Sequence, residues 1–291
     1  MAIEAALDTV LQGVLLGGLY ALFAAGLSII FGVMRLVNLA HGDMIVLAAF
    51  LIFALAHSLG LPLWLALAVA LPLMFALGYV LQRVVLNRVV GRDILPPLLI
   101  TFGLSIVTQN GLLAAFSADS RRISANGWES ASLRLTDGLA VGVTPLMTLA
   151  TAVLAIVALN QLFYRTKMGR AFRAVSDDPV TAQLMGVDNR HVFAVAMGLA
   201  LAVCAVAALF LGVRANFDPS IGPARLIFAF EAVIIGGLGS LWGTLAGGVI
   251  LGLAQTVGAE INPEWQLLAG HVVFLAVLLM RPRGLFARRA L

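Results

Sequence analysis

The segment Thr9–Val33 reads TVLQGVLLGGLYALFAAGLSIIFGV and contains no charged residue. About 20 apolar residues are enough to cross the hydrocarbon core of a bilayer. Inside that core the backbone must satisfy its own hydrogen bonds, so a single apolar segment crosses it as a helix. We therefore predict a membrane-spanning helix here. Comparable apolar runs follow along the chain: Val37–His57, Pro62–Leu81, Pro96–Phe116, Val143–Phe163, Val192–Val213, the glycine-rich Leu226–Gly258, and Trp265–Met280.

The composition indicates the same fold class. Of the 291 residues, 62% are hydrophobic and 11% are charged, and the mean hydropathy is +1.05. A soluble domain has about 25% charged residues, so membrane lipid must cover most of this surface. The length allows about eight or nine membrane elements. We predict an all-α, polytopic transmembrane helical bundle that forms a single domain over residues 1–291.

Basic residues set the expected orientation of this bundle. They gather in loops between apolar runs, which is typical of cytoplasmic loops. They do not form a basic groove with interleaved aromatic residues, so nucleic acid is not an expected partner. The segment Ser117–Gly142 has balanced charge and should face outward, which places the N-terminus outside and the C-terminus in the cytoplasm. The basic residues concerned are Arg83, Arg88 and Arg92; Arg165, Lys167, Arg170, Arg173 and Arg190; and Arg281, Arg283, Arg288 and Arg289.

The run Leu226–Gly258 raises a question of parity, that is, whether it crosses the membrane an odd or an even number of times. If the loop with Lys167 and the C-terminal tail are both cytoplasmic, this run must enter and leave the membrane on the same side. Two short spans, or a re-entrant hairpin near Gly239, satisfy that condition. One long helix would place the basic tail outside, so we expect the run to be broken.

Small residues recur at helical spacing in two runs. In lipid, such spacing lets helix backbones approach closely. We interpret both sets as helix-packing surfaces, either fixed or able to slide during a conformational cycle. The first set is Gly13, Gly17, Ala21 and Ala25, and the second is Gly236, Gly239, Gly243 and Gly247.

Polar residues within the apolar runs are the candidates for a pathway through the membrane. A charged group in the hydrocarbon core costs at least about 2.5–3.5 kcal/mol, so such residues face the interface, a polar cavity or a partner. The segment around Gly42 is either an interfacial turn where a helix begins or a helix break close to a pathway. Glu231 either forms a structural bond between helices, with Arg225 as one option, or meets a substrate ammonium. The full set is Asn38, His41, Gly42, Asp43, Gln109, Asn110 and Glu231.

Neither metal binding nor catalysis is expected of this chain. One histidine with one nearby acid is a weak metal pattern, and the single cysteine, Cys204, lies in an apolar run. The sequence shows no nucleophile–base or metal-ligand spacing. We therefore expect a protein that is not an enzyme and that binds no cofactor itself.

The loop 164–190 contains the most specific local pattern. Asp178 is a good N-cap, Pro179 suits the first helical position, and Gly186 suits the position after the last turn. These signals predict a short helix, Pro179–Met185, whose apolar residues need a partner surface. Either this helix packs under the membrane domain or it docks into another protein. Its apolar residues are Val180, Leu184 and Met185.

Four segments, in order, resemble the LivH-type permeases of branched-chain amino-acid ABC importers, and the likeness runs nearly from end to end. They are Phe31–Phe50 (FGVMRLVNLAHGDMIVLAAF), Thr166–Gly186 (TKMGRAFRAVSDDPVTAQLMG), Phe230–Gln255 (FEAVIIGGLGSLWGTLAGGVILGLAQ) and Arg281–Phe286 (RPRGLF). The resemblance implies a bacterial inner-membrane protein that forms half of a translocation pathway.

The resemblance also implies partners. These are a LivM-type second permease subunit, two cytoplasmic ATPase subunits and a periplasmic substrate-binding protein. ATP and Mg would bind the ATPases, since this chain contains no GxxxxGK[ST] phosphate-binding loop. The short helix would be the coupling helix that docks into an ATPase, and its motion would drive alternating access. The coupling residues would be Arg170, Asp177, Asp178, Pro179, Val180, Leu184, Met185 and Gly186.

Three other readings remain open from the sequence. The first is a permease for urea, short amides or nucleosides. Urea-type relatives in the family that the chain resembles often carry a longer polar insertion than Ser117–Gly142, so the resemblance mildly favours amino acids over urea. The second is a secondary transporter driven by an ion gradient, with Glu231 and Asp43 as coupling-ion sites. The third is a membrane scaffold that transports nothing.

Overall fold

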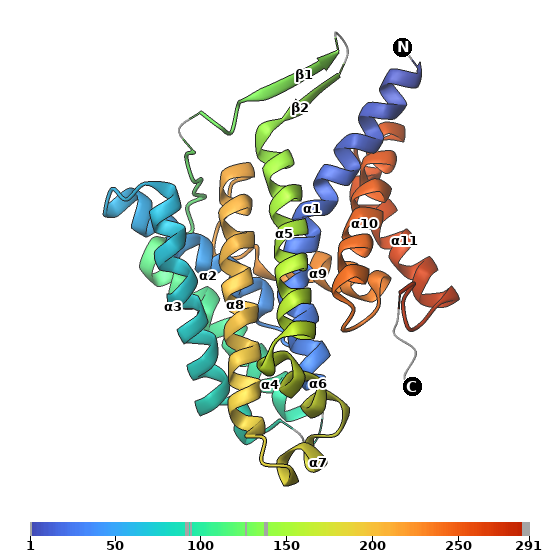
Figure 1. Cartoon of the computed structure of the whole chain (residues 1–291). Helices are drawn as coiled ribbons and strands as arrows, with labels where there is room; N and C mark the ends of the chain where they lie inside the picture. The colour runs from blue at the N-terminus through green and yellow to red at the C-terminus, as the bar shows by residue number, and fades with distance from the viewer. Residues whose placement is uncertain (1, 91–92, 94, 126, 137–138, 287–291) are drawn as a thin grey trace.

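The computed structural model describes residues 2–90, 93, 95–125, 127–136 and 139–286, so Arg92, Arg288 and Arg289 lie outside the described residues. The chain is mostly helical (Figure 1). The helices are α1 (Ala2–Met34), α2 (His41–Phe53), α3 (Leu63–Val84), α4 (Leu95–Phe116), α5 (Val143–Arg165), α6 (Lys167–Asp177), α7 (Pro179–Leu184), α8 (Asn189–Arg214), α9 (Gly222–Gly236), α10 (Leu241–Ile261) and α11 (Trp265–Met280).

The predicted fold class is confirmed. Seven described helices are long and apolar enough to cross a membrane. Helices α9 and α11 add two shorter elements of 15 and 16 residues. The result matches the upper end of the predicted eight or nine membrane elements. Figure 1 shows α1 at the centre, α5 and α8 in front of it, α10 and α11 on one side, α2 and α3 on the other, and α4 behind α8.

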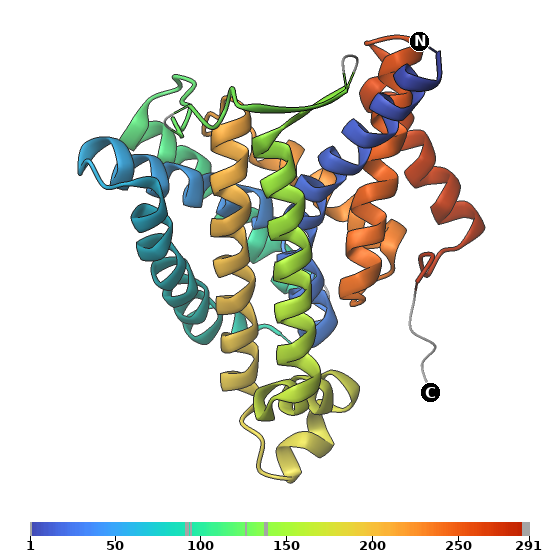
Figure 2. The ribbon, with the colours of Figure 1, turned by 45° about the horizontal axis from the view of Figure 1, so that its top comes forward.

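The two ends of the bundle differ. Helices α5 and α8 extend beyond the other spans and carry α6 and α7 at one end, here called the α7 end (Figure 2). The opposite end carries the start of α1 and a hairpin of β1 (Ser132–Thr136) and β2 (Leu139–Gly142) within the segment predicted to face outward. We call it the hairpin end.

The basic loops meet at the α7 end. Arg83, at the end of α3, lies 3.4 Å from the Asp188 carboxylate that precedes α8. Arg35, after α1, donates to the carbonyl of Ser176 in α6 at 3.3 Å. The positive charge of the loops after α3 and α5 predicts that they lie on the same side of the membrane. These loops do lie at one end of the molecule.

The glycine-rich run is broken, which excludes one long helix. Helix α9 ends at Gly236, and α10 begins at Leu241 with Ser240 as its N-cap. Gly237 and Gly239, in the turn between them, have φ values of 102° and 80°, where a side chain would be strained. Gly239 also lies against Gly32 near the end of α1, so the turn lies at the α7 end. Helix α9 starts beside Asp43, inside the bundle, and runs to this turn, and α10 then returns to the hairpin end.

Helix α2 begins inside the bundle. The predicted run starts at Val37, but residues 35–40 are not helical and α2 starts at His41. The His41 Nε2 atom lies 2.8 Å from the Phe23 carbonyl oxygen, which belongs to the middle of α1. Helix α2 itself has 13 residues and continues into a π-helical turn, Ala54–Ser58, and the two together form one of the seven apolar segments counted above.

Candidate coupling surface and buried polar clusters

Helix α6 fixes the loop 164–190 to the bundle. Its buried side, with Phe172 and Val175, packs against the membrane domain. The Ser176 hydroxyl donates to the Gly32 carbonyl at 2.6 Å, and Arg173 donates to the Phe163 carbonyl. The polar loop thus contains an amphipathic helix that the sequence analysis did not predict, and this helix touches both α1 and α5.

Helix α7 is the predicted short helix, one residue shorter because Met185 is its C-cap. The Asp178 carboxylate accepts from the backbone N–H groups of Val180 at 2.9 Å and Thr181 at 3.1 Å. Gly186, with φ at 88°, ends the segment. The side chain of Asn189 donates to the Pro179 carbonyl at 2.6 Å, which ties α7 to the start of α8.

The apolar side chains of α7 point away from the bundle. Val180, Leu184 and Met185 are 69%, 82% and 80% exposed, whereas Ala182 is 5% exposed. The sequence left two options for these residues, packing under the membrane domain or docking into another protein. Their exposure shows that they do not pack under the membrane domain. A cleft of about 1030 Å³ is lined by Val180 and other residues of α7, by the end of α1, by Asp93 and Leu95–Pro97, and by the start of α8. Arg170 and Asp177 lie on α6 and complete the predicted coupling set.

Asp178→Ala is expected to weaken the coupling that the resemblance assigns to α7. The Thr181 hydroxyl and the backbone N–H groups of Thr181 and Val180 hold the pKa of the Asp178 carboxyl below its usual range. The cap is therefore complete at neutral pH and is lost only as the pH falls through this lowered pKa. We expect Asp178→Ala to reduce uptake partially and Asp178→Asn, which keeps a capping oxygen, to retain it. Equal uptake in both variants, measured in vesicles at pH 7, would contradict the role of the cap.

Asp43 is the centre of a buried polar cluster between α2 and α4. Its carboxylate accepts from the Ser105 hydroxyl at 2.5 Å and from the Gln109 amide at 3.0 Å. The Asp43 residue is 1% exposed. Gly42 packs so closely on the start of α9 that a Cβ atom there would lie 2.8 Å from the Leu226 nitrogen. The first turns of α2 and α9 therefore meet at this cluster.

The other predicted pathway residues near α2 have separate local partners. The Asn38 side chain accepts from the Ala40 N–H at 3.0 Å. His41 bonds to α1, as described above, and lies 3.7 Å from the Cys204 sulfur. Asn110 is exposed and donates to the Ile106 carbonyl in its own helix, so it does not join the Asp43 cluster. The structure thus brings Gln109 to Asp43 but not Asn110.

Thr101 and Ser105 were not predicted from the sequence, although a signal was present. Thr101 accepts from the Leu39 N–H at 3.2 Å and so supports the non-helical segment before α2. Thr101, Ser105 and Gln109 are four residues apart, which places them on one face of a helix. A polar stripe inside an apolar run is an interhelical bonding signal in lipid.

Asp43→Leu is expected to destabilise the protein more than Asp43→Asn. Leucine would remove the acceptor of the Ser105 hydroxyl and one of the two acceptors of the Gln109 amide, which also donates to Ser105 at 3.1 Å. A buried donor left without an acceptor costs about 1–3 kcal/mol. Asparagine keeps one acceptor oxygen at the same place. Thermal melting of the purified protein in mild detergent would rank wild type above Asp43→Asn and Asp43→Leu last. A melting temperature for Asp43→Leu equal to that of the wild type would exclude a structural role for this cluster.

Glu231 pairs with a histidine and not with Arg225, the option considered from the sequence. Its carboxylate contacts Nδ1 of His271 on α11. Nearby, the Tyr20 hydroxyl donates to the Gln255 side chain at 2.5 Å. Arg214 and Arg225 are close enough to Tyr20 to interact electrostatically with it. His271, Tyr20 and Gln255 were not predicted, because nothing local in the sequence indicates which helices meet.

The predicted packing glycines lie at helix contacts, except for Gly239, which lies in the turn after α9. Gly13 and Gly17 face α10. Gly243 and Gly247 face α9, where Gly236 is the reciprocal contact of Gly243. A Cβ atom on Gly17 would lie 2.7 Å from the Gly248 carbonyl oxygen. Backbones therefore touch directly between α1, α9 and α10.

These features together define a class of protein. It is a polytopic membrane protein with buried polar clusters between its helices and an exposed apolar helix at one end. No group of His, Cys, Asp or Glu that could hold a metal ion occurs among the residues that the structure describes. An exposed apolar surface of this kind marks a site of interaction with another protein or a membrane.

Comparison with known proteins identifies the family. The family model described as "Branched-chain amino acid transport system / permease component" matches residues 9–280, and the chain belongs to this family. It is 28% identical to the high-affinity branched-chain amino acid transport system permease protein BraD of Pseudomonas aeruginosa, with 97% of this chain and 96% of that protein covered. It is 30% identical to the LivH permease protein of Escherichia coli K12 over the same shares. It is also 24% identical to the E. coli LivM permease protein, covering 92% of this chain and 67% of that protein.

Proposed function

We propose that this protein is the membrane-spanning permease subunit of an ATP-driven importer for branched-chain amino acids and forms half of the translocation pathway. The observation that carries the proposal is α7. It is an N-capped helix held beyond the end of the bundle, with Leu184 and Met185 more than three-quarters exposed. Such a helix is too short to be stable alone in water, so a partner surface is needed to cover it.

The proposed partners follow from the relatives and from this geometry. A LivM-type subunit would supply the other half of the pathway. The E. coli LivM permease protein is a relative of this chain. Two ATPase subunits that bind ATP and Mg would receive α7 and its counterpart. A substrate-binding protein would deliver the amino acid at the hairpin end. The α7 end would then be cytoplasmic, with the N-terminus outside, in a bacterial inner membrane.

The structure suggests how motion at α7 would reach the membrane. Helix α6 bonds to α1 through Ser176 and Gly32, and Gly32 also touches the turn at Gly239. A displacement of α6 and α7 would therefore act on α1 and on the α9–α10 turn together. Since these helices meet backbone to backbone, they would re-pack as units. That re-packing would alternate access to the pathway from the two sides.

Co-purification from membranes in mild detergent tests the proposal. A tagged chain should bring down a second polytopic subunit and ATPases with phosphate-binding loops. The reconstituted complex should take up leucine only with ATP and its binding protein. A homo-oligomer without ATPases, whose uptake stops with a protonophore and ignores ATP, would instead favour the ion-coupled transporter and the Glu231–His271 pair as its proton site. Uptake of urea, short amides or nucleosides in place of leucine would change the substrate class alone.

A further inference from the structure

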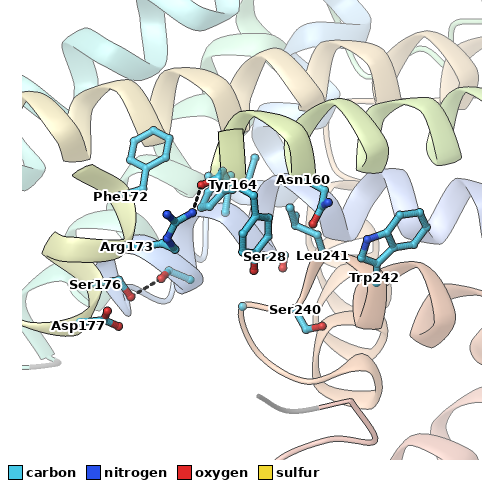
Figure 3. A pocket seen from close by; sticks show the side chains of 14 residues that line it. Ser28, Asn160, Tyr164, Phe172, Arg173, Ser176, Asp177, Ser240, Leu241 and Trp242 are labelled. Carbon is cyan, nitrogen blue, oxygen red and sulfur yellow. Dashed lines mark hydrogen bonds between the residues drawn. The ribbon is translucent and has the colours of Figure 1, made fainter. Parts of the chain in front are cut away.

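A second cavity lies between the loop 164–190 and the α9–α10 turn. It has a volume of about 270 Å³ and is bounded by α1, the end of α5, α6 and residues 239–242 (Figure 3). Tyr164 and Trp242, on its rim, are 42% and 50% exposed. Tyr and Trp are enriched at the membrane interface. The cavity therefore lies at the interface of the α7 end, between two elements that the proposed motion displaces.

Polar groups converge on this cavity and one of them lacks a partner. The side chains of Ser28, Asn160 and Ser240 come from three elements and gather on one side of it (Figure 3). Ser28 is 2% exposed, and its hydroxyl oxygen has no hydrogen-bond partner among the described residues. A buried hydroxyl without a partner is costly, so this group is placed to bond to a ligand.

The charged lining residues have both signs. Arg173 donates to the Phe163 carbonyl and lies over the Tyr164 ring, with its Cζ atom 5.2 Å from the ring centroid. A guanidinium has five N–H donors, so donors remain for a carboxylate. Asp177, one turn further along α6, supplies a carboxylate for an ammonium group. The charges thus complement a small zwitterion.

The remaining lining is apolar and the volume is small. Its apolar residues are Ile29, Phe163, Phe172, Leu241 and Trp242. Pockets for drug-sized ligands have volumes of about 300–1,000 Å³, so this cavity suits something smaller. An amino acid with an aliphatic side chain has the required size, charges and apolar surface.

We propose that this cavity is an inhibitory site for the imported amino acid, which enters it from the cytoplasmic side. The inference rests on the proposed function, because that function supplies both the ligand and the orientation. A bound amino acid would join α6 to the α9–α10 turn through Arg173 and Ser240. It would hold the two elements together and so slow the transport cycle as the product accumulates.

The test uses the complete complex in proteoliposomes that enclose ATP, so that only complexes with their ATPases inside are active. The initial rate of labelled leucine uptake is measured with increasing unlabelled leucine in the lumen, and with glutamate as the comparison. Ser28→Ala removes the unpartnered hydroxyl without breaking a bond of the empty protein. Asn160→Leu removes a second polar group. Gln161→Leu, its neighbour on α5 outside the cavity lining, is the matched control.

We expect luminal leucine, but not glutamate, to inhibit uptake by the wild type and by Gln161→Leu. Loss of one hydrogen bond of about 1.4 kcal/mol corresponds to a tenfold change in affinity. Ser28→Ala and Asn160→Leu should therefore each need about tenfold more luminal leucine for the same inhibition. Inhibition that is absent in the wild type, or unchanged in both cavity variants, would overturn the inference. If the proposed function itself is wrong, the wild type takes up no leucine even when the lumen contains ATP but no leucine.

Discussion

Leu184→Arg is expected to abolish ATP-driven uptake while leaving the permease folded. Leu184 is 82% exposed in the chain alone, so arginine meets no neighbour within this protein. In the complex the leucine would be buried in an ATPase surface. Burial of a leucine side chain contributes about 1.5–3 kcal/mol, and an arginine there must also lose its hydration. Association with the ATPase should therefore weaken between about tenfold and a hundredfold or more.

The measurement is the amount of ATPase that co-purifies with the tagged permease, together with leucine uptake. Leu133→Arg is the matched control, because Leu133 is also an exposed leucine, at 51%, but belongs to β1 at the hairpin end. It should keep the ATPases. Full association and uptake in Leu184→Arg would show that α7 is not the coupling helix.

Gly17→Val is expected to prevent accumulation of folded protein. A Cβ atom on Gly17 would meet the backbone of α10, with the Gly248 carbonyl oxygen 2.7 Å away. Backbone atoms cannot rotate aside as a side chain does, so the two helices would have to separate. Overpacking costs about 1–3 kcal/mol when side chains can adjust, and occasionally more. That is a large part of a total stability of about 5–15 kcal/mol.

Gly111→Val makes the matched control. Gly111 lies in α4, and a Cβ atom there would meet nothing within 4 Å among the described residues. Valine is also a better helix former than glycine. Size-exclusion chromatography of the detergent extract should show a monodisperse peak for Gly111→Val and little or none for Gly17→Val. Equal peaks would mean that α1 and α10 do not need backbone contact.

The sequence predicted the membrane elements well because the bilayer imposes a length and a composition on each of them. The last run, Trp265–Met280, agrees with α11 at both ends. Parity predicted the break between α9 and α10, and glycine spacing predicted close helix packing. The cap at Asp178 and the stop at Gly186 predicted α7, since these signals are local.

The sequence did not predict which side chains meet across helices. Asp43 and Gln109 are 66 residues apart, and Glu231 and His271 are 40 residues apart. Apolar runs in lipid have little periodicity to show which face is inward, so the pairing of faces cannot be read from one run. The late start of α2 has a similar cause, because its buried, non-helical approach is stabilised by Thr101 on another helix.

The turn after α9 has a consequence for the biogenesis of the protein. The carbonyl groups of Ile235 and Gly236 accept from the N–H groups of Leu285 and Phe286 at 2.9 and 3.1 Å. The last carbonyls of a helix have no partner within it, and here their partners come from the far end of the described chain. The ribosome therefore synthesises α10 and α11 before the last carbonyl groups of α9 can find these partners. The C-terminal end of α9 therefore receives these two partners only after α11 has been made and the chain has returned to the α7 end.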